Sequence, residues 1–306
     1  MTITTSAPTL TLERPPLQVP RSGEVARLLV RCPDQRGAVA AIGTFLSQWG
    51  AETISLDQHT TDCRTGELFQ RTEFHLPEFS ARRERFEEDF QRNVAATWQM
   101  TWSLASATTP KRIAIMASKR DHCLVDLLWR ARRKESPFSV GMVISNHPDL
   151  EEQVRSFGFP FVHIPVARDR KAEAEARQLE QLHREHFDLV VLARYMQILS
   201  AEFVDAVGCP IINIHHSFLP AFIGADPYRR AKDRGVKLVG ATAHYVTKDL
   251  DEGPIIEQDV ARVTHRASLD DVVRLGAEVE RSVLSRAVQW HCEDRVIRHG
   301  NSTIVF

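Results

Sequence analysis

The chain has 306 residues, of which 39 are Lys or Arg and 40 are Asp or Glu, and its formal net charge is -1. At roughly 100 to 200 residues per domain, this length is sufficient for two domains. The near-zero charge gives no electrostatic reason to bind nucleic acid or an anionic membrane surface. We therefore expect a small-molecule ligand.

The cysteines and the N-terminal segment bear on the compartment. Five cysteines are scattered without CxxC spacing, which argues against a secreted disulfide framework and against a zinc knuckle. Residues 1–24 contain several Thr and Pro and lack the basic and apolar regions of a signal peptide. No apolar run approaches the roughly 20 residues of a membrane helix. We expect a cytoplasmic protein with a flexible tail over 1–24 and no membrane partner.

Residues 25–105 are predicted to form a first domain with the element order βαββαβ. Apolar residues from Val39 to Trp49 recur on one face of a first helix, and residues from Phe86 to Trp98 recur at the spacing of a second. The predicted strands are 25–32, 52–60, 67–75 and, closing the domain, about 98–104. This is the order of a ferredoxin-like fold.

A linker rich in small residues is predicted at 106–111, and a second domain follows over 112–306. Its strands and helices alternate: strands at 112–117, 139–145 and 187–192, and helices at 121–134, 149–157 and 170–186. A long amphipathic helix at 269–294 and a strand at 302–306 complete it. The alternation predicts a doubly wound, mostly parallel, Rossmann-like sheet, whose ligands bind outside the carboxyl ends of the strands.

Three polar residues follow two of the apolar segments in this domain. Residues 211–223 read IINIHHSFLPAFI, so Asn213 and His215 are two positions apart on one strand and point the same way. Asp251 lies in the later segment GATAHYVTKDLDEGPII. An amide donor beside an imidazole suits an oxygen that becomes negative, and a carboxylate can raise the imidazole pKa or hold a water. The trio indicates acyl chemistry at a carbonyl.

The same motifs carry a family resemblance. Asn-Ile-His, the following Ser-Phe-Leu-Pro and the pattern HYVTxxLDxGP resemble the formyltransferase-fold enzymes that use 10-formyltetrahydrofolate. Within that group, the doubled His215-His216, the run LARYMQIL at 192–199 and the added N-terminal module resemble the formyltetrahydrofolate deformylase family over roughly residues 25 to 306. The resemblance implies hydrolysis to formate and tetrahydrofolate without metal or redox cofactor. It also implies supply of formate for purine synthesis and balancing of one-carbon folate pools.

The resemblance also implies site residues. Asn213 and His215 would hold the oxyanion, and Asp251 would orient the water. The folate-binding residues would be Arg194, Tyr195, Met196, Gln197, Ile198, Leu199, Val246, Thr247 and Asp249. The residues expected to shape the site are His216, Ser217 and Gly224. Apolar walls with backbone hydrogen-bonding groups suit the flat, polar pterin.

Two departures bear on the substrate. Related transferases that act on a phosphorylated amine have a Gly-rich loop after the first strand, whereas residues 117–123 contain no glycine. Water is therefore the expected acceptor. Asp226 stands where the deformylases usually have lysine, so the role of that loop is open. The alternatives are a formyltransferase acting on a non-phosphorylated amine and a non-catalytic folate or amino-acid sensor.

The first domain carries a second resemblance. With Asp34 and Gly37 at its first strand-helix turn, it resembles an ACT domain, a module that often binds amino acids between paired copies. We expect a regulatory ligand at these two residues, with methionine as activator and glycine as inhibitor by resemblance to the deformylases. A tetramer or hexamer with paired ACT domains is the expected assembly, and a block serving only oligomerisation is the alternative.

Overall fold

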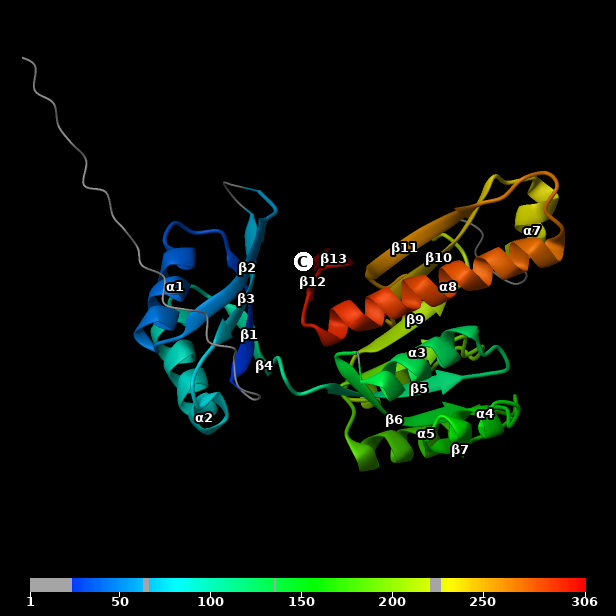
Figure 1. Cartoon of the computed structure of the whole chain (residues 1–306), viewed down its shortest axis with the longest axis horizontal. Helices are drawn as coiled ribbons and strands as arrows, with labels where there is room; N and C mark the ends of the chain where they lie inside the picture. Colours follow the sequence, from blue (N-terminus) through cyan, green and yellow to red (C-terminus); the bar gives the residue numbers. More distant parts are fainter. Residues whose placement is uncertain (1–23, 63–65, 135, 221–226) are drawn as a thin grey trace, which may run out of the picture.

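The computed structural model describes residues 24–62, 66–134, 136–220 and 227–306. Gly224, Asp226 and residues 1–23 of the predicted tail lie outside these ranges. The chain forms a four-stranded sheet, a seven-stranded sheet and a two-stranded C-terminal hairpin (Figure 1). In Figure 1 the hairpin lies between the two larger sheets.

The N-terminal unit has the predicted order βαββαβ, and its antiparallel sheet is ordered β2-β3-β1-β4. Both helices cover one face, where Phe45 lies edge-on to Phe86 and Phe90 at centroid distances of 5.1 and 5.2 Å. The elements are β1 (Val25–Pro33), α1 (Ala38–Gln48), β2 (Glu52–Thr60), β3 (Glu67–His75), α2 (Phe79–Phe90), η1 (Gln91–Ala95) and β4 (Thr101–Ser106).

The closing strand of this unit begins later than predicted. The π-helical turn η1 extends α2, and Gln99 then adopts a left-handed φ of 52°. Strand β4 therefore begins at Thr101 rather than near residue 98. The helical spacing that includes Val94 and Trp98 thus overlaps the start of the closing strand predicted at about 98–104.

The seven-stranded sheet is ordered β11-β10-β9-β8-β5-β6-β7. It is parallel from β9 to β7, and β10 and β11 are antiparallel additions. The predicted mostly parallel sheet is confirmed. Its elements are β5 (Lys111–Ala117), α3 (His122–Arg133), β6 (Phe138–Ser145), α4 (Glu151–Ser156), β7 (Phe161–His163), α5 (Lys171–Glu185), β8 (Leu189–Ala193), α6 (Ala201–Ala206), β9 (Ile211–His215), α7 (Pro227–Arg234), β10 (Leu238–Tyr245) and β11 (Ile255–Arg262).

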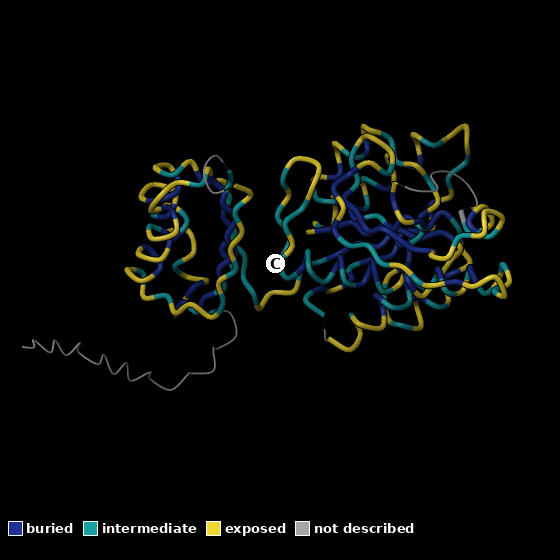
Figure 2. Tube along the Cα trace, turned by 90° about the horizontal axis from the view of Figure 1, so that it is seen from above, coloured by how far each residue is buried: buried dark blue, intermediate teal, exposed yellow. Residues whose placement is uncertain are grey.

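A long helix crosses this sheet. Helix α8 (Leu269–Cys292) begins with a capping box between Ser268 and Asp271 and ends two residues before the predicted limit. Val283, Leu284 and other residues of one face are fully buried against β9 and β10. Figure 2 shows the buried residues concentrated along the centre of this unit. The hairpin of β12 (Val296–His299) and β13 (Ser302–Val305) follows.

The end of α8 touches the N-terminal sheet. Arg71 of β3 donates hydrogen bonds to the carbonyl oxygens of Glu293 and Asp294, at 3.2 and 3.1 Å. Its guanidinium also pairs with Glu73 at 2.9 Å. Since the last carbonyls of a helix lack intrahelical partners, an arginine is a favourable neighbour for them. The two units are thus joined through the C-terminus of α8.

Candidate active site

A cavity of about 580 Å³ lies where β8 and β9 end, which is the edge predicted for the ligand. Its walls come from the segment after β8, from β9 itself, from the loop after β10 and from α7 and α8. Asn213, His215 and Asp251 all line it. The structure therefore brings the predicted trio together in one cavity.

The imidazole of His215 is held by Asp251. Its Nδ1 lies 3.1 Å from Oδ2 of Asp251, and the His215 side chain is only 8% exposed. Burial alone would raise the pKa of the Asp251 carboxyl, but the contact with His215 outweighs burial and holds that pKa well below its usual range. The Nε2 of His215 is buried and has no hydrogen-bond partner among the described residues. One ring nitrogen is thus fixed while the other is left for a substrate atom.

His244 is a site residue that the sequence interpretation missed. Its Nδ1 lies 2.9 Å from the carbonyl oxygen of Tyr245, which only accepts, so Nδ1 carries the proton. In the neutral ring Nε2 then accepts from Nδ2 of Asn213, at 3.2 Å. The same Nε2 lies 3.6 Å from Oδ1 of Asp251. The signal was present, since His244 begins the HYVTxxLDxGP pattern.

The loop that carries Asp251 folds tightly against β10. A Cβ at Gly253 would overlap the carbonyl oxygen of Tyr245, so only glycine fits this approach. The Tyr245 amide donates to the Pro254 carbonyl at 2.9 Å. Asp251 itself adopts a left-handed φ of 58°. The Asp-x-Gly-Pro segment therefore sets the position of the carboxylate.

The residues predicted to bind folate line one arm of the cavity, which we call the slot. Met196, Ile198 and Leu250 are 55%, 60% and 58% exposed, so apolar side chains face an open space there. Val246, Thr247, Gln197, Leu199 and Asp249 also line the cavity. Exposed apolar walls of this kind suit a flat ring system.

Two of the predicted slot residues direct their side chains elsewhere. The hydroxyl of Tyr195 accepts a hydrogen bond from Gln178 at 2.9 Å within a buried apolar cluster. The side chain of Arg194, which has a left-handed φ of 60°, places Nε 3.2 Å from Oε2 of Glu280. Arg194 therefore belongs to the part of the cavity formed by α8.

Two of the residues predicted to shape the site, His216 and Ser217, directly follow His215, and the third, Gly224, lies outside the described residues. The ring of His216 is 5.3 Å from that of His215, and burial together with the Arg194 charge lowers the pKa of His216 to about 4. Ser217 is buried, and its carbonyl accepts a hydrogen bond from the Thr242 hydroxyl at 3.0 Å.

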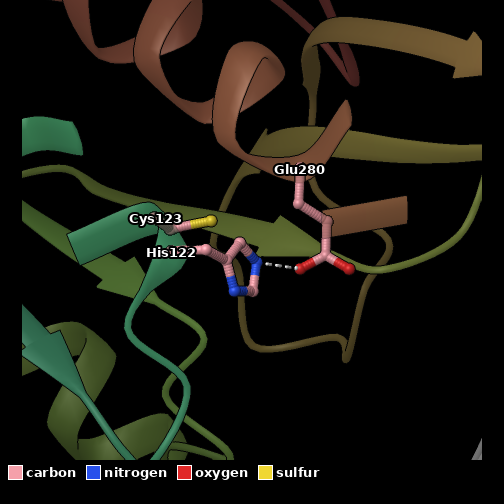
Figure 3. A group of neighbouring side chains, drawn as sticks. All are labelled: His122, Cys123 and Glu280. Atoms are coloured by element: carbon pink, nitrogen blue, oxygen red, sulfur yellow. Dashed lines mark hydrogen bonds and ion pairs between the residues drawn. The ribbon is translucent and has the colours of Figure 1, made fainter. Parts of the chain in front are cut away.

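Glu280, a second residue that the sequence interpretation missed, is a buried acid in the middle of α8. It is 1% exposed, and its carboxylate accepts a hydrogen bond from His122 at 2.8 Å (Figure 3). The Tyr228 hydroxyl donates a second hydrogen bond to it. Burial would raise its pKa, but these contacts and the Arg194 charge lower that pKa below the usual value. The sequence feature that could have identified Glu280 is its position as an acid on the otherwise apolar face of a predicted helix.

His122, Cys123 and Glu280 place three potential metal-binding atoms within 4.8 Å of one another (Figure 3). Burial raises the pKa of the Cys123 thiol well above its usual value, so the thiol stays protonated and is a poor ligand. Arg194 already supplies a positive charge to Glu280. These residues do not fit a cation, and the absence of a catalytic metal stays a prediction.

The predicted regulatory turn lies far along the chain from this cavity. Gly37 has a left-handed φ of 98° and begins α1, and a Cβ there would lie 3.0 Å from the ring of Trp98. The amide of Asp34 donates to the carbonyl of Gly66 at 2.9 Å.

Within the described ranges, no helix is both long and apolar enough to span a membrane.

Known proteins resemble this chain in sequence and in structure. Residues 111–288 match the Formyl transferase family. A formyltetrahydrofolate deformylase from Mycobacterium tuberculosis is 62% identical over 283 residues, covering 92% of this chain and 91% of that protein.

Two crystal structures extend the comparison. A formyltetrahydrofolate deformylase from Pseudomonas syringae has a TM-score of 0.87 and 43% identity, covering 92% of this chain and 94% of that one. A glycinamide ribonucleotide transformylase from Symbiobacterium toebii has a TM-score of 0.60 and 30% identity but covers only 64% of this chain. The deformylases therefore share the N-terminal unit as well as the larger sheet. The chain belongs to the formyltetrahydrofolate deformylase family.

Proposed function

We propose that this enzyme hydrolyses 10-formyltetrahydrofolate to formate and tetrahydrofolate, and that Asn213, His215 and Asp251 act on the formyl group. One observation carries this assignment. Asp251 clamps Nδ1 of His215 at 3.1 Å, while Nε2 stays buried without a hydrogen-bond partner among the described residues of the cavity. An imidazole held in this way is prepared to meet an oxygen of the substrate.

Each member of the trio has a distinct role in the proposal. Asp251, whose depressed pKa keeps it ionised, orients the attacking water and offsets the positive charge that His215 carries when it donates a proton. As the water oxygen bonds to the formyl carbon, one of its protons passes by way of Asp251 to solvent, and Asn213 and His215 hold the resulting oxyanion. The C–N bond then breaks, and His215 passes a proton to the departing nitrogen, directly or through water. Ionisation of the formic acid returns a proton to the site.

The slot would hold the pterin. Its exposed apolar side chains, Met196 and Ile198 on one side and Leu250 on the other, would sandwich a flat ring, and the loop backbone would provide hydrogen bonds. The amide of Met196 donates to the Ser118 hydroxyl at 3.0 Å, which anchors this wall to the loop after β5.

The acceptor in the proposal is water. The loop after β5 has no glycine, and its Ser118 donates to Asn146 at 2.7 Å while it accepts from Met196. The Ser118 hydroxyl is therefore already engaged, and the loop lacks the glycines of a backbone cradle for phosphate. A turnover assay with 10-formyltetrahydrofolate and water as the only acceptor tests the assignment. Adding candidate amines to that assay separates a hydrolase from a transferase.

We further propose that the N-terminal unit is an ACT-type domain that binds methionine or glycine near Asp34 and Gly37 and pairs with its copy in a tetramer or hexamer. Its βαββαβ order and the left-handed Gly37 at the first turn support this. We also propose a cytoplasmic location and a role in supplying formate for purine synthesis.

Calorimetric titration of methionine and glycine, with and without a folate analogue, tests the regulatory proposal. A ligand that changes catalysis must have its own affinity changed by the folate by the same factor. If neither amino acid binds the full-length protein, the unit serves assembly alone.

A further inference from the structure

The same cavity is also lined by a group of charged residues that the proposed mechanism does not use. Beyond His215 lie the rings of His216, at 5.3 Å, and then Tyr228, 6.1 Å further on. We call this part the arginine arm, and its residues are Arg120, His122, Arg194, Tyr228, Arg229 and Glu280. Three arginines and one acid make this arm cationic, in contrast to the apolar slot.

The reaction creates a negative charge that must leave the trio. Hydrolysis turns a neutral formyl group into a formate anion, which forms next to the ionised carboxylate of Asp251. Two negative charges in a partly buried site repel each other, because the surrounding protein screens them less than water does. A nearby cation would therefore draw the product away from Asp251.

Arg194 is placed to be that cation. Its side chain is 11% exposed, and its Nε lies 3.2 Å from Oε2 of Glu280, which fixes the guanidinium in place. The contact with Glu280 is an ion pair, and neither Nε nor Nη1 of Arg194, both of which are buried, has a hydrogen-bond partner among the described residues. The Glu280 carboxylate is shared with His122 and Tyr228, so it does not satisfy all five donors of the arginine. Arg194 retains donors for a second, small carboxylate.

His216 connects the trio to this arm. Its pKa is lowered by burial and by the charges of Arg194 and His215, and raised by those of Glu280 and Asp251, so the ring is near both groups of residues. With a pKa of about 4, His216 is neutral at pH 7. A neutral His216 ring can donate a hydrogen bond to the formate anion but does not attract it by charge.

From these contacts we propose that the arginine arm is the product subsite for formate and that Arg194 is the residue that binds it. The inference rests on the proposed function, since formate is the product of that reaction. It gives Arg194 a role separate from the pterin slot. It also gives Glu280 a role, as the positioning residue that orients the guanidinium.

A binding experiment with the full-length protein tests this directly. Carbon-13 formate is titrated into the protein at constant ionic strength, and binding is followed by the NMR line width. The variant is the double substitution Arg194→Gln with Glu280→Gln, because removing Arg194 alone would leave Glu280 buried without its cation. The matched control is Arg286→Gln, which removes an arginine of α8 paired with Asp259 at 2.8 Å outside the cavity.

We expect saturable binding of formate to the wild type and to the control, and at least about tenfold weaker binding to the double variant, given the strength of bidentate arginine-carboxylate contacts. Arg194→Lys keeps the positive charge but loses the paired N-H donors of the guanidinium, so its affinity for formate should lie between those of the wild type and the double variant. The inference is overturned if the wild type shows no saturable binding of formate. It is also overturned if the double variant, shown to be folded by circular dichroism, binds formate as tightly as the wild type.

Turnover measured on the same wild-type preparation separates this inference from the proposed function. Protein that hydrolyses 10-formyltetrahydrofolate but binds no formate overturns the product subsite alone. Protein that binds formate through Arg194 but does not hydrolyse the folate overturns the proposed reaction and, with it, the assignment of formate as a product.

Discussion

The side chain of His244 accepts a hydrogen bond from the Asn213 amide across 3.2 Å, and its other nitrogen donates to the Tyr245 carbonyl at 2.9 Å. The second contact fixes the tautomer, and the tautomer in turn fixes which way the Asn213 amide faces. One amide hydrogen is thereby used, which leaves the other for the oxyanion in the proposed mechanism. His244 is thus a positioning residue for Asn213, the proposed oxyanion donor.

This relationship predicts different results for two substitutions of His244. His244→Asn can still donate to the Tyr245 carbonyl but loses the contact with Asn213, whereas His244→Gln places its amide where Nε2 was. We expect kcat to fall on the order of 10-fold to 100-fold in the first variant, below the 100-fold to 1,000-fold typical of losing an oxyanion donor outright. The glutamine variant should retain more activity. Equal activity of His244→Asn and wild type would show that Asn213 needs no such support.

Gly253 offers a test of how the loop places Asp251. Gly253→Ala forces the loop away from the Tyr245 carbonyl, so we expect kcat to fall by about 100-fold, as for a misplaced catalytic group, with a small change in the free energy of unfolding. Gly43→Ala, in α1 with nothing within 4 Å of its new Cβ, is the matched control and should leave kcat unchanged. Unchanged kcat in Gly253→Ala would contradict the role given to this turn.

The depressed pKa of Asp251 predicts a pH dependence of stability. The folded-state pKa lies below the unfolded value of about 4, so the ionised carboxylate stabilises the fold above that pH, and this contribution is lost as pH falls toward the folded-state pKa. The difference in free energy of unfolding between wild type and Asp251→Asn should therefore shrink below about pH 4. Urea unfolding at pH 7 and at lower pH measures it. A difference independent of pH would argue that the contact with His215 does not shift this pKa.

Chelation tests the metal-free chemistry. Because Cys123 stays protonated and Arg194 neutralises Glu280, we expect full activity after exhaustive EDTA treatment and in a Cys123→Ser variant. Loss of turnover with EDTA and its recovery with zinc would require a different mechanism.

The sequence predicted the parallel strands β5, β6, β8 and β9 and the trio because these have strong local signals, whereas the parallel strand β7, of three residues, was not predicted. Strands 52–60 and 67–75 were predicted with the observed limits, since a polar turn separates them. Strand β10 was not predicted: seven of its eight residues are buried, so it has no alternation of polar and apolar side chains. His244 and Glu280 were missed because their roles arise from contacts with residues 31 and 158 positions away. The single sequence does not show such partners.

In the proposed mechanism, Asp251 and His215 act together on a formyl group with water as the acceptor. The most direct measurement is formate release from 10-formyltetrahydrofolate, without added amine, by wild type, Asp251→Asn and the control Asp205→Asn, an exposed acid paired with Lys248 at 2.8 Å. We expect turnover by wild type and control, and a loss of about 100-fold or more in Asp251→Asn with the fold intact. An Asp251→Asn rate above about a tenth of wild type would contradict the account.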